Sequence, residues 1–340
     1  MSRRLISLQA LAGVVVSAVC LVVAFRHVEL SSFTAALRTA DYRWLLWYPV
    51  LCVALNLVRG EVWRLLLKRK CGLAPAFWAY TVGFLFNNIL PLRVGEAARI
   101  VVLARHERLP IAEVAATAIL ERLLDLAAVL LVLVCTLPVV GLGEGALSYG
   151  AMLALVVIVG VVGAIYAASR WRDQLEKPIG RLSALGGPAV NESVIRRWRE
   201  AVDGVSRLLK PRIGVPAALG ILFVWAMSVA AQWTVLLAFQ PRATAVEGAF
   251  MVAVVSLAIA VPAAPGFIGV YQWAGQQALV HAFPVSYTPA SGLAIAVAAH
   301  AISYLCSTLL GVVGLWYFGV SLSLGSELRR KASLGEAETA

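Results

Sequence analysis

The chain has 340 residues, of which 61% are apolar and only 14% are charged, and its formal net charge is +11. Soluble domains carry roughly 25% charged residues and few apolar runs of 18 or more. Composition therefore excludes an ordinary soluble protein and predicts an all-α polytopic membrane protein, with residues 1–340 as a single membrane domain. The spans must be helices because every backbone polar group in hydrocarbon needs an internal partner, and the alternation typical of barrel strands is absent.

Six apolar runs are long enough to cross the bilayer. They lie near residues 5–25, 42–66, 111–139, 146–169, 213–239 and 289–318. The first run is longer than the roughly 7–15 apolar residues of a signal peptide, so we expect it to be retained as a span. The segment 26–43 that follows it carries three arginines, and we expect it to form an interfacial amphipathic helix.

Two further apolar stretches are interrupted. Stretch 76–90 ends at Pro91 and Gly95, and stretch 247–283 is broken by two prolines and two glycines between positions 262 and 269. The pieces on either side of each break are too short to cross roughly 30 Å of hydrocarbon.

Lysines and arginines orient the chain, because cytoplasmic loops carry an excess of them. We expect the basic loop 170–212 to be cytoplasmic, with an amphipathic helix over 191–210 on the anionic inner leaflet. The N-terminus, the turn 68–70, the segment 99–108 and the tail 319–340 are also basic and share that side. Both ends of the first broken stretch are then cytoplasmic and both ends of the second are external. Each stretch is therefore expected to be a re-entrant hairpin.

The two breaks repeat. The Pro-x3-Gly pattern at 91–95 recurs at 265–269, and the same displacement of 174 residues superimposes the flanking spans. Since the copies have opposite topology, the sequence predicts an inverted repeat, with 42–139 as its first copy and 213–318 as its second. Inverted repeats with discontinuous helices are typical of alternating-access transporters, whose binding site lies at the repeat interface.

The first break carries the charges that suggest a ligand. It lies in FNNILPLRVGEAARI, residues 86–100. Arg93 offers a forked, permanently charged donor suited to phosphate, and the amides of residues 93–96 begin a half-helix that favours an anion. We expect these groups to bind an anionic head group, in particular a lipid phosphate. The alternative is an ion pair of Arg93 with Glu96 or Asp125 that holds the hairpin closed.

A second charged group lies within the predicted span 111–139. Glu121 and Asp125 are four residues apart and share one helix face, with Arg122 between them. Carboxylates at such depth are costly and are usually functional or paired. Four interpretations stay open: proton or cation coupling, gating by pairing with Arg93 or Arg99, a buried structural ion-pair network, and a metal-bound catalytic pair.

Other candidates are weaker. Arg59 either reaches a cavity or extends to the interface. Gln272 follows the second break, and His300 is a lone histidine of the kind more often hydrogen-bonded in a core than used as a ligand. We find no Cys-x2-Cys pattern and no Cys/His cluster. We therefore expect no cofactor and no metal, and we expect membrane lipids, rather than nucleic acid, as partners.

Several motifs resemble those of a known family. NNILPLRVGEAARIVVL followed by AATAILERLLDL resembles the signature of the lysylphosphatidylglycerol synthase transmembrane region family, which includes the flippase-like domain of the bacterial multiple peptide resistance factor. VPAAPGFIGVYQW resembles its second motif and HAISYLCSTLLGVVGLW its closing span. The resemblance covers about residues 5–320.

This resemblance implies a domain that moves lipids between leaflets of the bacterial inner (plasma) membrane. Together with the charges above, it points to a substrate-binding set of Asn88, Arg93, Gly95, Glu96, Arg99, Gly266, Gly269 and Gln272. It also points to a coupling or gating set of Glu121, Arg122, Asp125, Arg59 and His300. Many relatives have glutamate where this chain has Gln272. With about 20 residues after its last span, the chain leaves no room for an aminoacyl-transferase domain, so we do not expect it to make lysyl lipid.

The favoured function is a flippase-like transporter of an anionic phospholipid or lipid-linked intermediate. The alternative is a membrane enzyme, or an accessory subunit of one, that acts on a lipid phosphate. The sequence argues against an enzyme because the first external loop offers only Glu29 and Asp41 as acids. A scaffold that acts through loop 170–212 is a third class. A second copy of the chain and a lipid-modifying enzyme stay open as protein partners.

Overall fold

The computed structural model describes residues 3–26, 28–91, 93–140, 170–184, 186–205, 210–260 and 264–319, with scattered positions between 152 and 167. Helix is the only regular secondary structure in these residues, which confirms the all-α class. The helices are α1 (Arg3–Phe25), α2 (Leu30–Thr39), η1 (Tyr42–Leu46), α3 (Trp47–Leu66), α4 (Leu73–Ile89), α5 (Val94–His106), α6 (Ile111–Val140), α8 (Arg172–Ala184), α9 (Pro188–Val205), α10 (Pro211–Phe239), α11 (Ala245–Ala258), η3 (Pro265–Phe267), α12 (Val270–Ala282) and α13 (Pro289–Tyr317).

Four continuous helices among the described residues are long and apolar enough to cross a membrane: η1–α3, α6, α10 and α13. They coincide with four of the six predicted spans. A fifth candidate is the pair α1 and α2, which is bent by 87°. The predicted span 146–169 and most of the predicted tail 319–340 fall outside the described residues. The chain is thus a multi-pass membrane protein.

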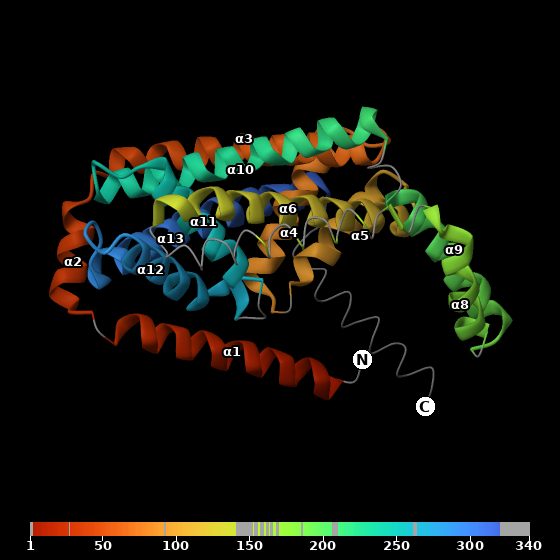
Figure 1. Ribbon diagram of the computed structural model, residues 1–340, viewed down its shortest axis with the longest axis horizontal. Coiled ribbons are helices and arrows are strands. Elements are labelled where there is room, and N and C mark those ends of the chain that lie inside the picture. The colour runs from red at the N-terminus through yellow and green to blue at the C-terminus, as the bar shows by residue number, and fades with distance from the viewer. Residues whose placement is uncertain are drawn as a thin grey trace.

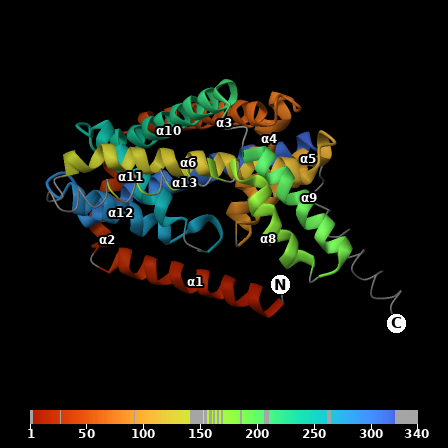
Figure 2. The same cartoon turned by 45° about the vertical axis from the view of Figure 1, so that its right-hand side comes forward.

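The bundle has two distinct ends (Figure 1). One end holds α2 and the α10–α11 and α12–α13 connections. The other holds the basic turn between α3 and α4, the end of α5, and the α8–α9 pair, which Figure 2 shows from a second angle. The described parts of the turn 68–70, the segment 99–108 and the loop 170–212, which were expected to be cytoplasmic, therefore gather at one end of the molecule. The orientation of that end in a cell stays a prediction.

The first broken stretch, α4–α5, leaves and returns at the same end. Lys70 precedes α4, and its Nζ lies 2.8 Å from a carboxylate oxygen of Glu113 at the start of α6. The backbone N–H of Gly72 donates to Glu107 Oε1, just after α5, at 2.9 Å. These contacts join the two ends of the hairpin at the basic end of the bundle.

The second broken stretch, α11–α12, does the same at the opposite end. The Tyr287 hydroxyl, in the turn after α12, donates to the carboxylate of Glu247 in the first turn of α11. α11 is capped by Thr244 Oγ1, which accepts from the Glu247 N–H at 3.4 Å. The chain therefore holds two hairpins whose open ends lie at opposite ends of the bundle.

Glycines set how closely the helices approach. A Cβ on Gly95 of α5 would lie 1.9 Å from the carbonyl oxygen of Gly83 in α4, and one on Gly311 of α13 would lie 2.6 Å from the carbonyl oxygen of Thr81. Helices in lipid gain no hydrophobic free energy by associating, so close backbone approach at small residues holds them together. The packing of α4 against both α5 and α13 depends on these positions.

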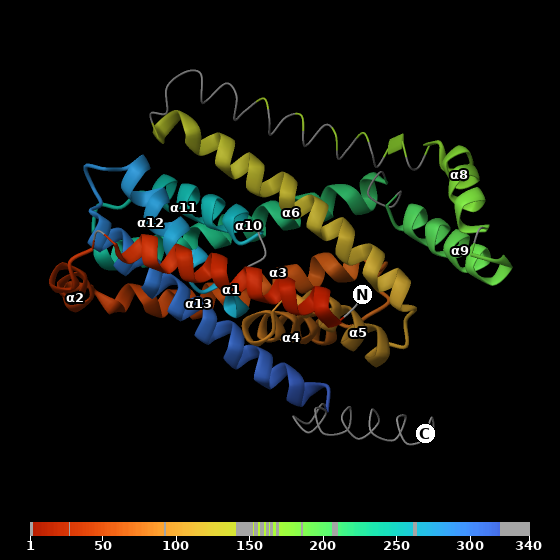
Figure 3. The same cartoon turned by 90° about the horizontal axis from the view of Figure 1, so that it is seen from below.

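Helix α1 lies across the bundle and covers the second break (Figure 3). The hydroxyl of Ser17 accepts a hydrogen bond from the N–H of Ala264 at 2.9 Å. The side-chain amide of Gln276 in α12 donates to the carbonyl oxygen of Ala24 at 3.0 Å. Gly269 has a φ of +93°, and a Cβ there would lie 2.2 Å from the Ser17 carbonyl oxygen. Glycine is thus required at this position by both conformation and space.

We expect Gly95→Ala to destabilise the protein by roughly 1–3 kcal/mol, because a backbone oxygen cannot move aside for the added methyl group. The measurement is the thermal unfolding midpoint in detergent. The matched control is Gly180→Ala in α8, where the nearest atom would be 3.4 Å away and alanine favours the helix. Equal midpoints for the two variants would contradict the packing described here.

Candidate functional site

The tips of the two hairpins meet inside the bundle. Arg93 caps α5 in the left-handed conformation, with φ +54° and ψ +37°. Its guanidinium donates to the carbonyl oxygen of Ile259 at the end of α11 and lies 5.5 Å from the centre of the Phe267 ring. The Tyr304 hydroxyl of α13 donates to the Asn88 carbonyl oxygen at 3.3 Å. The two breaks, far apart in the sequence, therefore form one structure.

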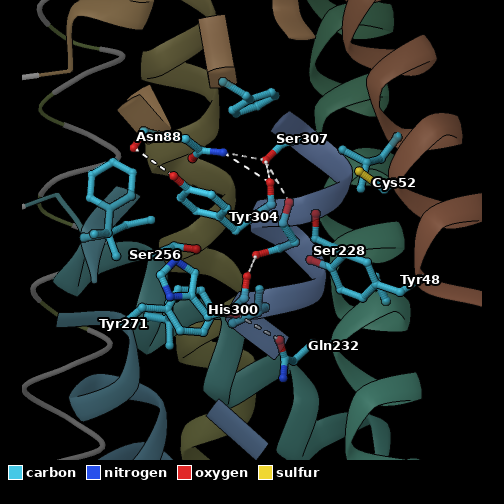
Figure 4. A pocket seen from close by; sticks show the side chains of 18 of the residues that line it. Tyr48, Cys52, Asn88, Ser228, Gln232, Ser256, Tyr271, His300, Tyr304 and Ser307 are labelled. Atoms are coloured by element: carbon cyan, nitrogen blue, oxygen red, sulfur yellow. Dashed lines mark hydrogen bonds between the residues drawn. The ribbon is translucent and has the colours of Figure 1, made fainter. Parts of the chain in front are cut away.

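A cavity of about 280 Å³ lies at this junction (Figure 4). Residues from α3, α4, α10, α11, α12 and α13 line it. Its lining combines aromatic rings with uncharged polar groups and contains one charged residue, Arg59. The labelled polar side chains around it are Tyr48, Asn88, Ser228, Gln232, Ser256, Tyr271, His300, Tyr304 and Ser307. Such a concave, largely apolar site with a few converging polar groups is the usual form of a small-molecule site.

Asn88, which the sequence analysis placed in the substrate-binding set, is part of this lining. Its Nδ2 donates to the hydroxyl of Ser307 at 3.0 Å and to that of Thr308 at 2.9 Å. These bonds tie the end of α4 to the middle of α13. A ligand that displaced these hydrogen bonds of Asn88 would therefore alter the contact between α4 and α13.

His300 and Gln272 form a pair beside the cavity. The Gln272 Nε2 lies 2.7 Å from His300 Nδ1, and the Gln272 Oε1 accepts from the N–H of Gly269 at 2.7 Å. The His300 ring, which lines the cavity, stacks on Tyr271 with ring centres 4.4 Å apart. Gln272 itself does not line the cavity; it caps α12 and fixes His300. The hydrogen-bonded interpretation of His300 thus fits the structure.

The carboxylates of α6 face an arginine of α3. Nη1 of Arg59 lies 3.1 Å from Glu121 and 3.0 Å from Asp125, and only 12% of the Arg59 side chain is exposed. Nε1 of Trp225 in α10 donates to Asp125 at 3.1 Å. Arg59 thus turns toward these carboxylates and not toward the membrane surface.

Two further arginines complete the network. Arg99 bonds Glu121 and Glu96, each at 2.9 Å, and its guanidinium lies 4.5 Å from the ring centre of Tyr80. Arg122 pairs with Glu96. With Arg59 and Asp125, the network contains three arginines and three carboxylates and is neutral overall. The proposed pairing of Arg99 with an α6 carboxylate is present, and within the described residues Arg93 forms no ion pair with Glu96 or Asp125.

The backbone at the first break is less available than the sequence suggested. The N–H of Gly95 donates to Asn87 Oδ1 at 2.9 Å, and that of Glu96 donates to the Arg93 carbonyl oxygen at 3.2 Å. Both amides therefore already have partners in the protein. Gly95 serves helix packing, and of the predicted anion-binding amides at 93–96 those of residues 95 and 96 are already taken.

Gly266 and Gly269 shape the second break. Gly266 lines the cavity with φ +67°, and a Cβ there would lie 2.6 Å from the Tyr304 ring. Gly269 is turned toward α1 and away from the cavity lining. The first glycine therefore belongs to the binding surface and the second to the frame around it.

Sequence reasoning missed Asn56, Asn87 and Trp225. Asn56 lines the cavity, Asn87 caps the start of α5, and Trp225 holds Asp125. Polar amides inside an apolar run were the available signal for the two asparagines. Trp225 carries no such signal because its neighbours in the span are uniformly apolar. Within the described part of the chain, no three His, Cys, Asp or Glu side chains are grouped as a metal site.

Glu121→Gln should destabilise the protein by roughly 3–5 kcal/mol, because Arg59 and Arg99 would lose the fully buried carboxylate that they share. The measurement is again the unfolding midpoint. Glu61→Gln is the control, since that carboxylate is 41% exposed and pairs at the surface with Arg64. If Glu121→Gln were as stable as the control but inactive, the carboxylate would be a coupling group and not a structural one.

Comparison with known proteins bears on this site. The chain is 26% identical to glycosyltransferase AglD of Haloferax volcanii over 93% of its own length, and it spans about half (55%) of that protein. No solved structure matches. The model of the lysylphosphatidylglycerol synthase TM region matches residues 10–311, which include both breaks, the cavity and the charged network. The chain is therefore a member of the lysylphosphatidylglycerol synthase TM region family.

Proposed function

We propose that this protein is a flippase-like transporter that moves an anionic phospholipid or lipid-linked intermediate between leaflets. The observation that carries the proposal is the position of Arg93. Its guanidinium lies where the two hairpins meet, beside the cavity, and pairs with no carboxylate of the described residues. A permanent positive charge held at such a place is suited to a phosphate.

The arrangement of helices supports alternating access. A long helix, two half-helices and a second long helix occur in the order α3, α4, α5, α6, and again in the order α10, α11, α12, α13. α3 packs against α10, and the hairpins open toward opposite ends. This is the order expected of an inverted repeat, in which the substrate site lies between copies that rock against each other.

The charged network is the element that we propose to switch during such a motion. It joins α3, α5 and α6 of the first copy and reaches α10 of the second through Asp125 and Trp225. An arriving phosphate would compete with Glu96, Glu121 and Asp125 for their arginines. Exchange of those pairs is our proposal for gating.

The rival function is an enzyme, or a subunit of one, that acts on a lipid phosphate. It is favoured by the relative from Haloferax volcanii, glycosyltransferase AglD, because this chain spans about half of that protein. Reconstitution in liposomes separates the two. Leaflet exchange of a labelled lipid without covalent change supports the transporter, and a chemically altered lipid supports the enzyme.

We place the protein in the bacterial inner membrane with both termini cytoplasmic.

Arg93→Ala and Arg93→Lys should both reduce leaflet exchange of a labelled anionic lipid about tenfold or more, with expression unchanged. The reason is that hydrogen bonds to a charged group contribute roughly 1.5–3 kcal/mol and lysine cannot reproduce the fork. Arg105→Ala, at the exposed end of the same helix, should exchange lipid normally. Normal exchange by both Arg93 variants would reject the role of Arg93.

A further inference from the structure

The residues that line the cavity indicate which lipid head group it binds. We infer that it takes an uncharged head group rich in hydroxyls, attached to the phosphate that Arg93 holds, and that it rejects a cationic aminoacyl head group. This inference rests on the proposed function for its phosphate, but it is carried by different residues of the cavity. The chemistry it names is that of a glycerol or a sugar on a lipid phosphate.

The charge of the lining is the first reason. The described lining contains no aspartate or glutamate, and its one charged residue is Arg59. The nearest carboxylates, Glu121 and Asp125, lie behind Arg59 and already bind it. An ammonium group that entered the cavity would lose its hydrating water. The lining offers no carboxylate to replace that water, and the Arg59 guanidinium would repel the group. Burying an unpaired charge is among the most costly events in a protein interior.

An unsatisfied acceptor is the second and independent reason. Asn56 lines the cavity and is only 2% exposed. Its Nδ2 donates to the carbonyl oxygen of Cys52 at 2.8 Å, which fixes the orientation of the amide. Its Oδ1 has no hydrogen-bond partner within the described structure. A buried acceptor left unfilled costs roughly 1–3 kcal/mol, so a ligand hydroxyl that reached this oxygen from the cavity would remove that cost.

A hydroxyl is the donor that fits both observations. It donates to Asn56 without bringing a charge to Arg59, which lies one turn further along the same face of α3. Because a hydroxyl also accepts, it can pair with the hydroxyl of Ser256, which points into the cavity in Figure 4 and makes no hydrogen bond with another described residue. The side chains of Asn56 and Ser256 can therefore both form hydrogen bonds with the hydroxyls of a polyol.

The size of the cavity agrees with this choice. About 280 Å³ is just below the roughly 300–1,000 Å³ of small-molecule sites. It can hold a head group but not a whole lipid. The acyl or prenyl chains would stay outside in the bilayer, and the phosphate would lie at the rim near Arg93, whose neighbours Ile259 and Phe267 line the cavity.

The test measures which lipids the purified protein retains and moves. Vesicles contain equal amounts of phosphatidylglycerol, a polyprenyl-phosphate hexose and lysyl-phosphatidylglycerol, and bound lipid is counted by native mass spectrometry. We expect at least one of the two neutral-head lipids to be retained tenfold or more over lysyl-phosphatidylglycerol. Which of them is retained identifies the glycerol or the sugar as the source. Equal or preferred retention of the lysyl lipid would overturn the inference.

Variants at Asn56 separate this preference from overall folding. Asn56→Leu should reduce the preference for the hydroxyl-bearing lipid about fivefold or more, and Asn56→Asp should raise the share of lysyl lipid. Gln277→Leu removes an amide of α12 that does not line the cavity. This control should change neither the preference for the hydroxyl-bearing lipid nor the share of lysyl lipid. An unchanged preference in both Asn56 variants would also overturn the inference. Retention without leaflet exchange would instead refute the proposed transport and leave the head-group preference standing.

Discussion

Backbone and charge inside a membrane must find partners within the protein, and this requirement shapes the structure more than any other. Each of two helix pairs, α4–α5 and α11–α12, is interrupted by a break, and hydrocarbon tolerates a break only where it is buried in protein or lines a polar cavity. Here each break supplies partners to the other. Arg93 from the first bonds the end of α11, and the carbonyl oxygen of Asn88 accepts from Tyr304 beside Gly266 of the second. The cavity lies where these contacts join the two breaks.

The charged residues divide into two groups with different roles. Six of them neutralise one another across α3, α5 and α6 and are held by Trp225 and the ring of Tyr80. Arg93 stands apart from that network. Every charge of that network has a partner, whereas Arg93 is exposed and pairs with no carboxylate of the described residues. This contrast directs a search for the ligand to Arg93.

Patterns in the sequence predicted the coarse architecture well. The long apolar runs and the two Pro-Gly breaks marked four helices of membrane-spanning length and the two interrupted helix pairs, because these depend on composition and local conformation. That the two pairs are re-entrant in a membrane stays a prediction. The site was predicted in part. Arg93 and the α6 carboxylates were identified as charged residues in apolar surroundings, and Asn88 was identified by the family resemblance. The roles of Gly95 and Gln272 were not, because packing against Gly83 and capping of Gly269 are set by neighbours that no spacing reveals.

The most direct test of the account is the side from which each hairpin is reached. In a variant without native cysteines, single cysteines would replace Lys70, Arg105, Arg242 and Val285, all at exposed positions, and would be treated with a membrane-impermeant thiol reagent. The account predicts that positions 70 and 105 are labelled from one side and positions 242 and 285 from the other. Labelling of positions 70 and 105 from opposite sides would make α4–α5 a full crossing and would contradict the opposed hairpins on which the site depends.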